Sequence, residues 1–133
     1  MGKTNLVCVN VGDKYSPDCV ERLFSMVMRN TTREFNFYCL TDNPSHYSQP
    51  IIPLPLTQPL FGWWNKMFLF KPGILPDGKY LYFDLDVVII DNIDCLFEFD
   101  GFGIARDFVR PDSGILGGKE YNSSVMKFTQ NQK

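Results

Sequence analysis

Two carboxylates, Asp84 and Asp86, are the residues whose types and spacing could best do chemistry in this chain. They follow an apolar, aromatic run at residues 79–83 that is typical of a buried strand, and the apolar run resumes at Val87. Because side chains at i and i+2 of an extended backbone share a face, we expect both carboxylates to be aimed at one spot. In apolar surroundings they need protons, a basic partner or a cation to neutralise them. Their hard oxygens suit Mg²⁺ or Mn²⁺, which in turn suits a diphosphate; two solvated aspartates at a strand end are the alternative.

The elements that must position these carboxylates begin with a strand–helix–strand unit. Residues 5–11 predict a short apolar strand, and Ser16 and Pro17 predict the start of a helix that stops near Asn30. Residues 35–39 alternate as a second strand, which indicates a parallel sheet with a right-handed crossover. The buried face of the helix is expected to comprise Val20, Leu23, Phe24, Val27 and Met28.

The middle of the chain predicts shorter elements. Residues 51–60 hold three prolines and predict an edge strand or an extended loop. Residues 63–70 predict a short helix that ends before Pro72. Its expected common face is Trp64, Met67 and Phe68.

The last third of the chain predicts the strand that carries Asp84, which follows a turn at residues 76–78. Residues 101–105 lead another strand, and residues 119–130 predict a closing helix with Val125 and Phe128 facing inward. The predicted fold class is therefore α/β, with three layers: a mostly parallel, twisted sheet flanked by helices.

Composition narrows the function classes. A length of 133 residues predicts one domain, and a net charge of −2 with scattered basic residues argues against partners such as nucleic acid or an anionic membrane. The single histidine, His46, lies in a polar loop, so a nucleophilic triad has no obvious base. The cysteines show no CxxC spacing and are interpreted as reduced thiols rather than a disulfide framework or zinc site; they are Cys8, Cys19, Cys39 and Cys95.

Targeting signals are not indicated. Residues 1–6 run straight into a strand, unlike a signal peptide, and no apolar stretch approaches the ~20 residues of a membrane span. We therefore expect a cytoplasmic protein.

The chain resembles the GT-A nucleotide-sugar glycosyltransferases, especially family eight, which includes glycogenin and bacterial galactosyltransferases. Four segments carry the resemblance, and they follow one another along the chain as they do in the family. The most specific is residues 80–97, where Asp-x-Asp, a β-branched run, Asn-Ile-Asp and Leu-Phe recur at the family's spacing. The other three are residues 9–15, Asn65-Lys66, and residues 105–107 followed by 112–114. The resemblance implies a Rossmann-like GT-A fold. It also implies a metal-dependent hexosyltransferase that uses a nucleoside diphosphate sugar, expected to be a UDP-sugar, and an unknown acceptor.

The resemblance also implies residue roles. Asp84 and Asp86 look like the ligands of Mn²⁺ or Mg²⁺, a cation that would stabilise the departing nucleoside diphosphate. Tyr15 looks like the aromatic residue on which uracil stacks, although it could simply pack on the sheet edge. Lys66 looks like the basic residue that contacts the donor. The other implied donor-binding residues are Val9, Asn10, Val11 and Leu85 near strand ends, and Arg106, Asp107, Asp112, Ser113 and Gly114 in the sugar pocket.

The chain departs from the family in two places. Asp112 stands where the family usually has Asn, which could shift sugar preference or form a turn. The sequence ends at Lys133, before the family's acceptor site and its third metal ligand, commonly His. We therefore expect residues 1–133 to be a donor-binding domain that is truncated or naturally short. Its sugar transfer is expected to be at least about 100-fold below that of a longer version of the same protein. Apolar surface near Ile115, Leu116 and Phe128 is expected to favour self-association.

Two other functions are alternatives. A nucleotide-sugar-binding domain would use the same residues without transferring the sugar. A phosphohydrolase of the haloacid dehalogenase type also carries Asp-x-Asp after an apolar strand, with the first Asp as nucleophile. Its usual Gly-Thr turn is replaced here by Val87 and Val88.

Overall fold

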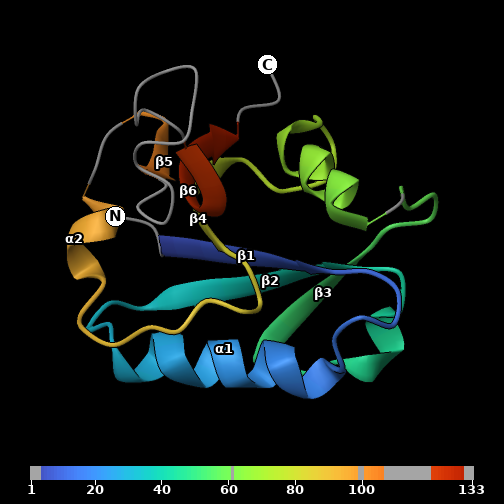
Figure 1. Ribbon diagram of the computed structural model, residues 1–133, viewed down its shortest axis with the longest axis horizontal. Helices are drawn as coiled ribbons and strands as arrows, with labels where there is room; N and C mark the ends of the chain where they lie inside the picture. The colour runs from blue at the N-terminus through green and yellow to red at the C-terminus, as the bar shows by residue number, and fades with distance from the viewer. Residues whose placement is uncertain (1–3, 61, 99–100, 107–120, 131–133) are drawn as a thin grey trace.

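A computed structural model describes residues 4–60, 62–98, 101–106 and 121–130, and within them six strands form one sheet. The strand order is β3-β2-β1-β4-β6-β5, and the first four of these strands are parallel (Figure 1). Their bounds are β1 Thr4–Asn10, β2 Phe35–Thr41, β3 Ile51–Pro55 and β4 Gly78–Phe83. The prolines of β3 lie in an edge strand, where a missing ladder donor is tolerated.

The sheet is completed by an antiparallel pair. β6 (Tyr121–Gln130) lies between β4 and β5 (Gly103–Arg106) and is antiparallel to both. Flanking helices cover both faces, so the predicted α/β class, with a mostly parallel sheet, is confirmed.

One face of the sheet is covered by α1 (Pro17–Arg29), which runs along its underside in Figure 1. Ser16 precedes the helix in an extended conformation and Pro17 takes the first helical position, as predicted. The side chains that α1 buries are Val20, Leu23, Met26 and Val27. Met28 was expected in this group but is 56% exposed, because the contact with the sheet follows the row containing Leu23 and Met26 instead. The short helix α2 (Asp94–Phe97) adds Phe97 to the same core.

The other face is covered by η2 (Gly62–Phe70), a 3₁₀ helix rather than an α-helix. With three residues per turn, Trp64, Met67 and Phe70 fall in one row, and that row is exposed. The prediction of a common face for Trp64, Met67 and Phe68 is therefore wrong. Leu69 instead lies in the core on this side, against residues such as Tyr80 and Tyr82 of β4.

The prediction of a closing helix at residues 119–130 is also wrong, because residues 121–130 form strand β6. Val125 packs on the α1 side of the sheet, whereas Met126 and Phe128 pack on the η2 side. A strand covered on both faces loses the simple apolar–polar alternation, which allowed a helical interpretation. Phe128 is 3% exposed and stacks on Tyr80 with ring centroids 5.6 Å apart, so it contributes no exposed apolar surface.

The cysteines are all free. Cys8 and Cys39 are register partners on β1 and β2 and are buried in the α1-side core, where burial raises the pKa of Cys8. Cys95 is exposed. This arrangement agrees with the interpretation of the cysteines as unbridged thiols. Along the described residues, we find no helix with the length and apolarity that a bilayer crossing requires.

Candidate functional site

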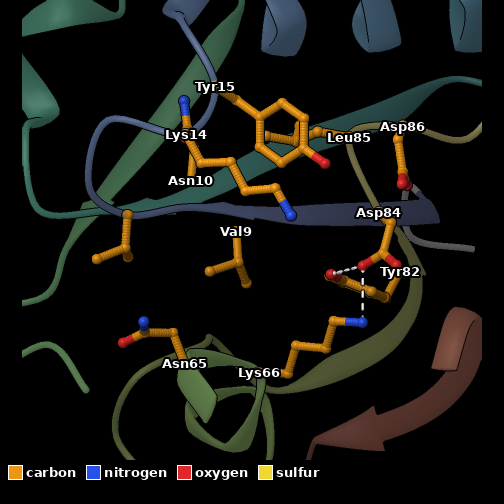
Figure 2. A pocket seen from close by; sticks show the side chains of 11 residues that line it. Val9, Asn10, Lys14, Tyr15, Asn65, Lys66, Tyr82, Asp84, Leu85 and Asp86 are labelled. Atoms are coloured by element: carbon orange, nitrogen blue, oxygen red, sulfur yellow. Dashed lines mark hydrogen bonds and ion pairs between the residues drawn. The ribbon is translucent and has the colours of Figure 1, made fainter. Parts of the chain in front are cut away.

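A cavity of ≈ 310 Å³ lies where β1 and β4 end, facing η2 (Figure 2). The carboxyl ends of parallel strands in open α/β sheets are the usual place for ligands, because side chains and loops from neighbouring strands converge there. The residues that line the cavity are Val9, Asn10, Val11, Lys14, Tyr15, Asn65, Lys66, Tyr82, Asp84, Leu85 and Asp86.

Asp84 is the centre of a polar cluster in this cavity. The ammonium nitrogen of Lys66 lies 2.8 Å from Oδ1 of Asp84, and the Tyr82 hydroxyl donates a hydrogen bond to the same oxygen (Figure 2). Burial, followed by the neighbouring charge of Asp84, raises the pKa of Tyr82 well above its usual range, so its hydroxyl stays protonated and donates. The Lys66 ammonium also lies 5.4 Å from the centre of the Tyr82 ring. The cluster therefore gives Asp84 a basic partner, one of the three neutralising arrangements expected from the sequence.

Asp86 reaches the same cavity by a route that differs from the sequence prediction. β4 ends at Phe83, and the chain turns through Leu85 and Asp86, with the Val87 amide donating to the Asp84 carbonyl at 3.3 Å. The two aspartates are therefore brought together by a turn and not by an extended strand, so that part of the prediction is wrong. The Asp84 amide still donates to the Ser124 carbonyl of β6 at 2.8 Å, and the turn follows directly after this contact. Asp86 is exposed at the cavity edge, whereas Asp84 is partly buried.

The carboxylates suit a divalent cation in part. Two carboxylates facing one cavity are hard oxygen donors of the kind that Mg²⁺ and Mn²⁺ prefer. In the described part of the chain no group of three or more His, Cys, Asp or Glu side chains gathers at one point. A cation at Asp84 and Asp86 would therefore depend on oxygens from a bound molecule to complete its coordination.

Tyr15 and Lys14 reach the cavity from the turn between β1 and α1. Gly12 allows that turn with φ 79°, a conformation that favours glycine, and its amide donates to the Asp42 carboxylate at 3.3 and 3.4 Å. The Lys14 ammonium lies 5.3 Å from the centre of the Tyr15 ring, and Figure 2 shows its side chain extending over the cavity. The turn thus places an aromatic ring and a cation opposite the aspartates.

Asn10 ends β1 between this cavity and a second one of ≈ 150 Å³, which Tyr15 and Tyr47 also line. Its amide nitrogen donates to the Tyr47 hydroxyl at 2.8 Å. Its Oδ1 is buried and has no hydrogen-bond partner among the described residues. A buried acceptor without a partner lowers the stability of a fold. Asn10 is thus a polar side chain that the fold alone does not explain.

Asn65 lies beside Lys66 and anchors the start of η2. Its Oδ1 accepts the Leu60 amide at 2.7 Å, and its Nδ2 donates to the Leu60 carbonyl at 2.9 Å. The Asn65 side chain is buried, with 1% exposure, and its two hydrogen bonds fix the backbone from which Lys66 extends.

The structure brings most of the predicted site residues together, while their roles stay predictions. Arg106 is the last residue of β5, and Asp107, Asp112, Ser113, Gly114, Ile115 and Leu116 lie outside the described residues. His46 is exposed and lines the smaller cavity. The sequence analysis missed Lys14, Asn65 and Tyr82 as cavity residues. Tyr82 could have been found from its position two residues before Asp84, because side chains at i and i+2 of an extended backbone share a face.

Comparisons with known proteins support the fold. The glycosyltransferase GlyE of Streptococcus pneumoniae TIGR4, in its apo form, superimposes with a TM-score of 0.64 at 16% identity. A second GlyE structure gives a TM-score of 0.64 at 15% identity and covers 95% of this chain. The chain spans about a third of the length of these proteins: the alignments cover 99% of this chain but 35% of the apo GlyE chain, and 34% of the second. At such identity the likeness establishes a glycosyltransferase-like fold alone. No protein-family model and no curated protein matches the chain.

Proposed function

We propose that this chain forms the donor-binding part of a metal-dependent glycosyltransferase of the GT-A type, close to family eight, which takes its sugar from a UDP-sugar. The observation that carries the proposal is the joint presence of Asp84, Asp86 and Lys66 in one cavity at strand ends of a glycosyltransferase-like sheet. The charges in this cavity balance without a ligand, since Lys14 and Lys66 oppose the two aspartates. A bound diphosphate would find positive partners in the two lysines, and a divalent cation would find negative partners in the two aspartates.

Each side chain has a task in this proposal. Tyr15 offers a ring to the uracil base, and Val9, Val11 and Leu85 form apolar walls beside the ribose. Lys66 donates hydrogen bonds to a phosphate or a sugar hydroxyl from the anchored backbone of η2. Asp84 and Asp86 would hold Mn²⁺ or Mg²⁺, which supplies Lewis-acid stabilisation of the leaving diphosphate. The sugar-pocket roles of Arg106, Asp107, Asp112, Ser113 and Gly114 belong to the same proposal.

The test is calorimetric titration of the chain with UDP, in Mn²⁺ and in chelator, for the wild type and two variants. We expect UDP to bind at least about tenfold more tightly in Mn²⁺, because the diphosphate completes the coordination that two carboxylates cannot. Asp84→Asn and Asp86→Asn should remove most of this dependence on Mn²⁺. Equal UDP affinity with and without the cation would rule out a metal site at these aspartates.

Incubation with labelled UDP-sugars and a panel of sugar acceptors separates transfer from the alternatives. Labelled product indicates a transferase, whereas metal-dependent UDP binding without product indicates a binding domain. Release of inorganic phosphate from simple phosphomonoesters without any nucleotide would favour the phosphohydrolase. The cytoplasmic location and self-association stay predictions, and fractionation and sedimentation would test them.

A further inference from the structure

Lys66 forms an ion pair with Asp84, one of the two carboxylates that would bind the cation in the proposed function. The pair is well shielded, since the Lys66 and Asp84 side chains are 19% and 22% exposed, and their charged atoms lie 2.8 Å apart. Lys14 also lines the cavity, but no ion pair of Lys14 is found among the described residues. The two cavity lysines therefore differ in their relation to the aspartates.

The backbone of Lys66 is held in place by its neighbours in η2, whereas its side chain reaches Asp84 through a long stem. Asn65 and Leu69 fix η2 on either side of it, through the Leu60 contact and through burial in the η2-side core. The lysine side chain itself is flexible, with four carbons between the backbone and the ammonium group. If Lys66 leaves, the Tyr82 hydroxyl still bonds to Asp84.

We propose that Lys66 is a displaceable counterion. It keeps a divalent cation from binding Asp84 in the absence of nucleotide, and it releases Asp84 when a diphosphate enters the cavity. This inference rests on the proposed function, because it assumes that Asp84 binds the cation. A cation approaching Asp84 alone must displace or stand close to the ammonium group, and the two positive charges repel. With a diphosphate present, Lys66 gains a new anionic partner and the carboxylate becomes available. Cation and nucleotide then favour each other's binding, and the effect is reciprocal.

The decisive variant is Lys66→Met, which keeps an apolar stem and removes the charge. We expect bare Mn²⁺, titrated without nucleotide and followed by the electron paramagnetic resonance signal of free Mn²⁺, to bind about 3- to 10-fold more tightly than to the wild type. That range corresponds to the loss of one partly shielded charge interaction. UDP in saturating Mn²⁺ should bind more weakly to the same variant by a similar factor, since the phosphate loses a partner. Opposite shifts in one variant are what a displaceable counterion requires.

Matched variants separate the counterion role of Lys66 from the general effect of removing a positive charge from the cavity. Lys14→Met removes a charge from the same cavity without removing a contact to Asp84, so its gain in bare Mn²⁺ affinity should be clearly smaller. Lys66→Arg keeps the charge and should leave bare Mn²⁺ binding weak. Thermal melting by circular dichroism checks folding, and Lys66→Gln serves if the Met variant is unfolded.

Unchanged or weaker Mn²⁺ binding in a folded, uncharged Lys66 variant would overturn the inference. So would an equal gain in Lys14→Met. If Asp84→Asn still abolishes metal-dependent UDP binding in that case, the proposed function stands and only the counterion role fails. If UDP binding depends neither on Mn²⁺ nor on Asp84, the proposed function and the counterion role of Lys66 are both wrong.

Discussion

At the residue scale, Asp84 illustrates how one carboxylate is stabilised inside a partly buried cavity. A lone charge there would be costly, and the fold offsets that cost with one ammonium group and one hydroxyl. Tyr82 contributes its ring to the core and its hydroxyl to the site, so a single side chain links stability with the proposed chemistry. Tyr80, two residues earlier on β4, donates instead to the neutral carbonyl of Pro76 at 2.7 Å.

These two tyrosines make a matched pair for measurement. Tyr82→Phe should lower the free energy of unfolding by about 1.5–3 kcal/mol, because a hydrogen bond to a charged group is lost. Tyr80→Phe should cost only about 0.5–1.5 kcal/mol, because its acceptor is neutral. Urea denaturation of both variants checks the difference. Equal losses would show that Asp84 gains little from the Tyr82 hydroxyl.

At the element scale, the loop between α1 and β2 is fastened to α2 by one carboxylate. Asp94 accepts hydrogen bonds from the Thr31 hydroxyl, from the Thr32 amide at 3.2 Å and from the Thr32 hydroxyl at 2.6 Å. The Ile93 amide adds a bond to the Asn30 carbonyl at 2.8 Å. These contacts connect the end of the long helix to the segment that returns from the Asp84–Asp86 turn.

The Asp94 contacts predict a pH dependence in acid. Hydrogen bonds from Thr31 and then from Thr32 lower the pKa of Asp94 from 3.8 to about 2. The fold therefore favours the deprotonated carboxylate, and its contribution is present above pH 3.8 and is lost as the pH falls through about 2. Asp94→Asn should be less stable than the wild type near neutral pH, and the gap should close across this range. Urea midpoints at a series of pH values provide the measurement, and a gap that stays constant down to the lowest pH would contradict the assignment.

At the scale of the whole molecule, the sheet has two cores, and the apolar lining of the cavity comes mainly from the η2-side core. Leu23 of α1 and Leu69 of η2 are both fully buried, on opposite faces. Lys66 extends from η2, whereas no residue of α1 itself lines the larger cavity. Packing on the η2 side should therefore affect ligand binding as well as stability.

Leucine truncation on each face tests this division. Leu23→Ala and Leu69→Ala should each cost about 2–5 kcal/mol of unfolding free energy, because both leave a cavity in a packed core. Val88, which is 72% exposed, supplies the control, since Val88→Ala should cost under about 0.5 kcal/mol. At temperatures where all variants are folded, Leu69→Ala should weaken Mn²⁺-dependent UDP binding more than Leu23→Ala. Equal effects on binding would mean that η2 does not position Lys66.

The sequence by itself determined the α/β class, the opening strand–helix–strand unit and most residues of the cavity. The fold class and the opening unit follow from local rules: the helical period of residues 17–29, the proline at the helix start, and the apolar run before Asp84. Most of the cavity residues were implied by the resemblance to the GT-A glycosyltransferases. Tertiary structure decided the rest. β6 is a strand that pairs with both β4 and β5, and η2 is a 3₁₀ helix that Asn65 and Leu69 anchor between Leu60 and the sheet. The pairing of Lys66 with Asp84 joins residues from separate elements, and no local pattern specifies such a contact, since only the folded sheet brings them to one cavity.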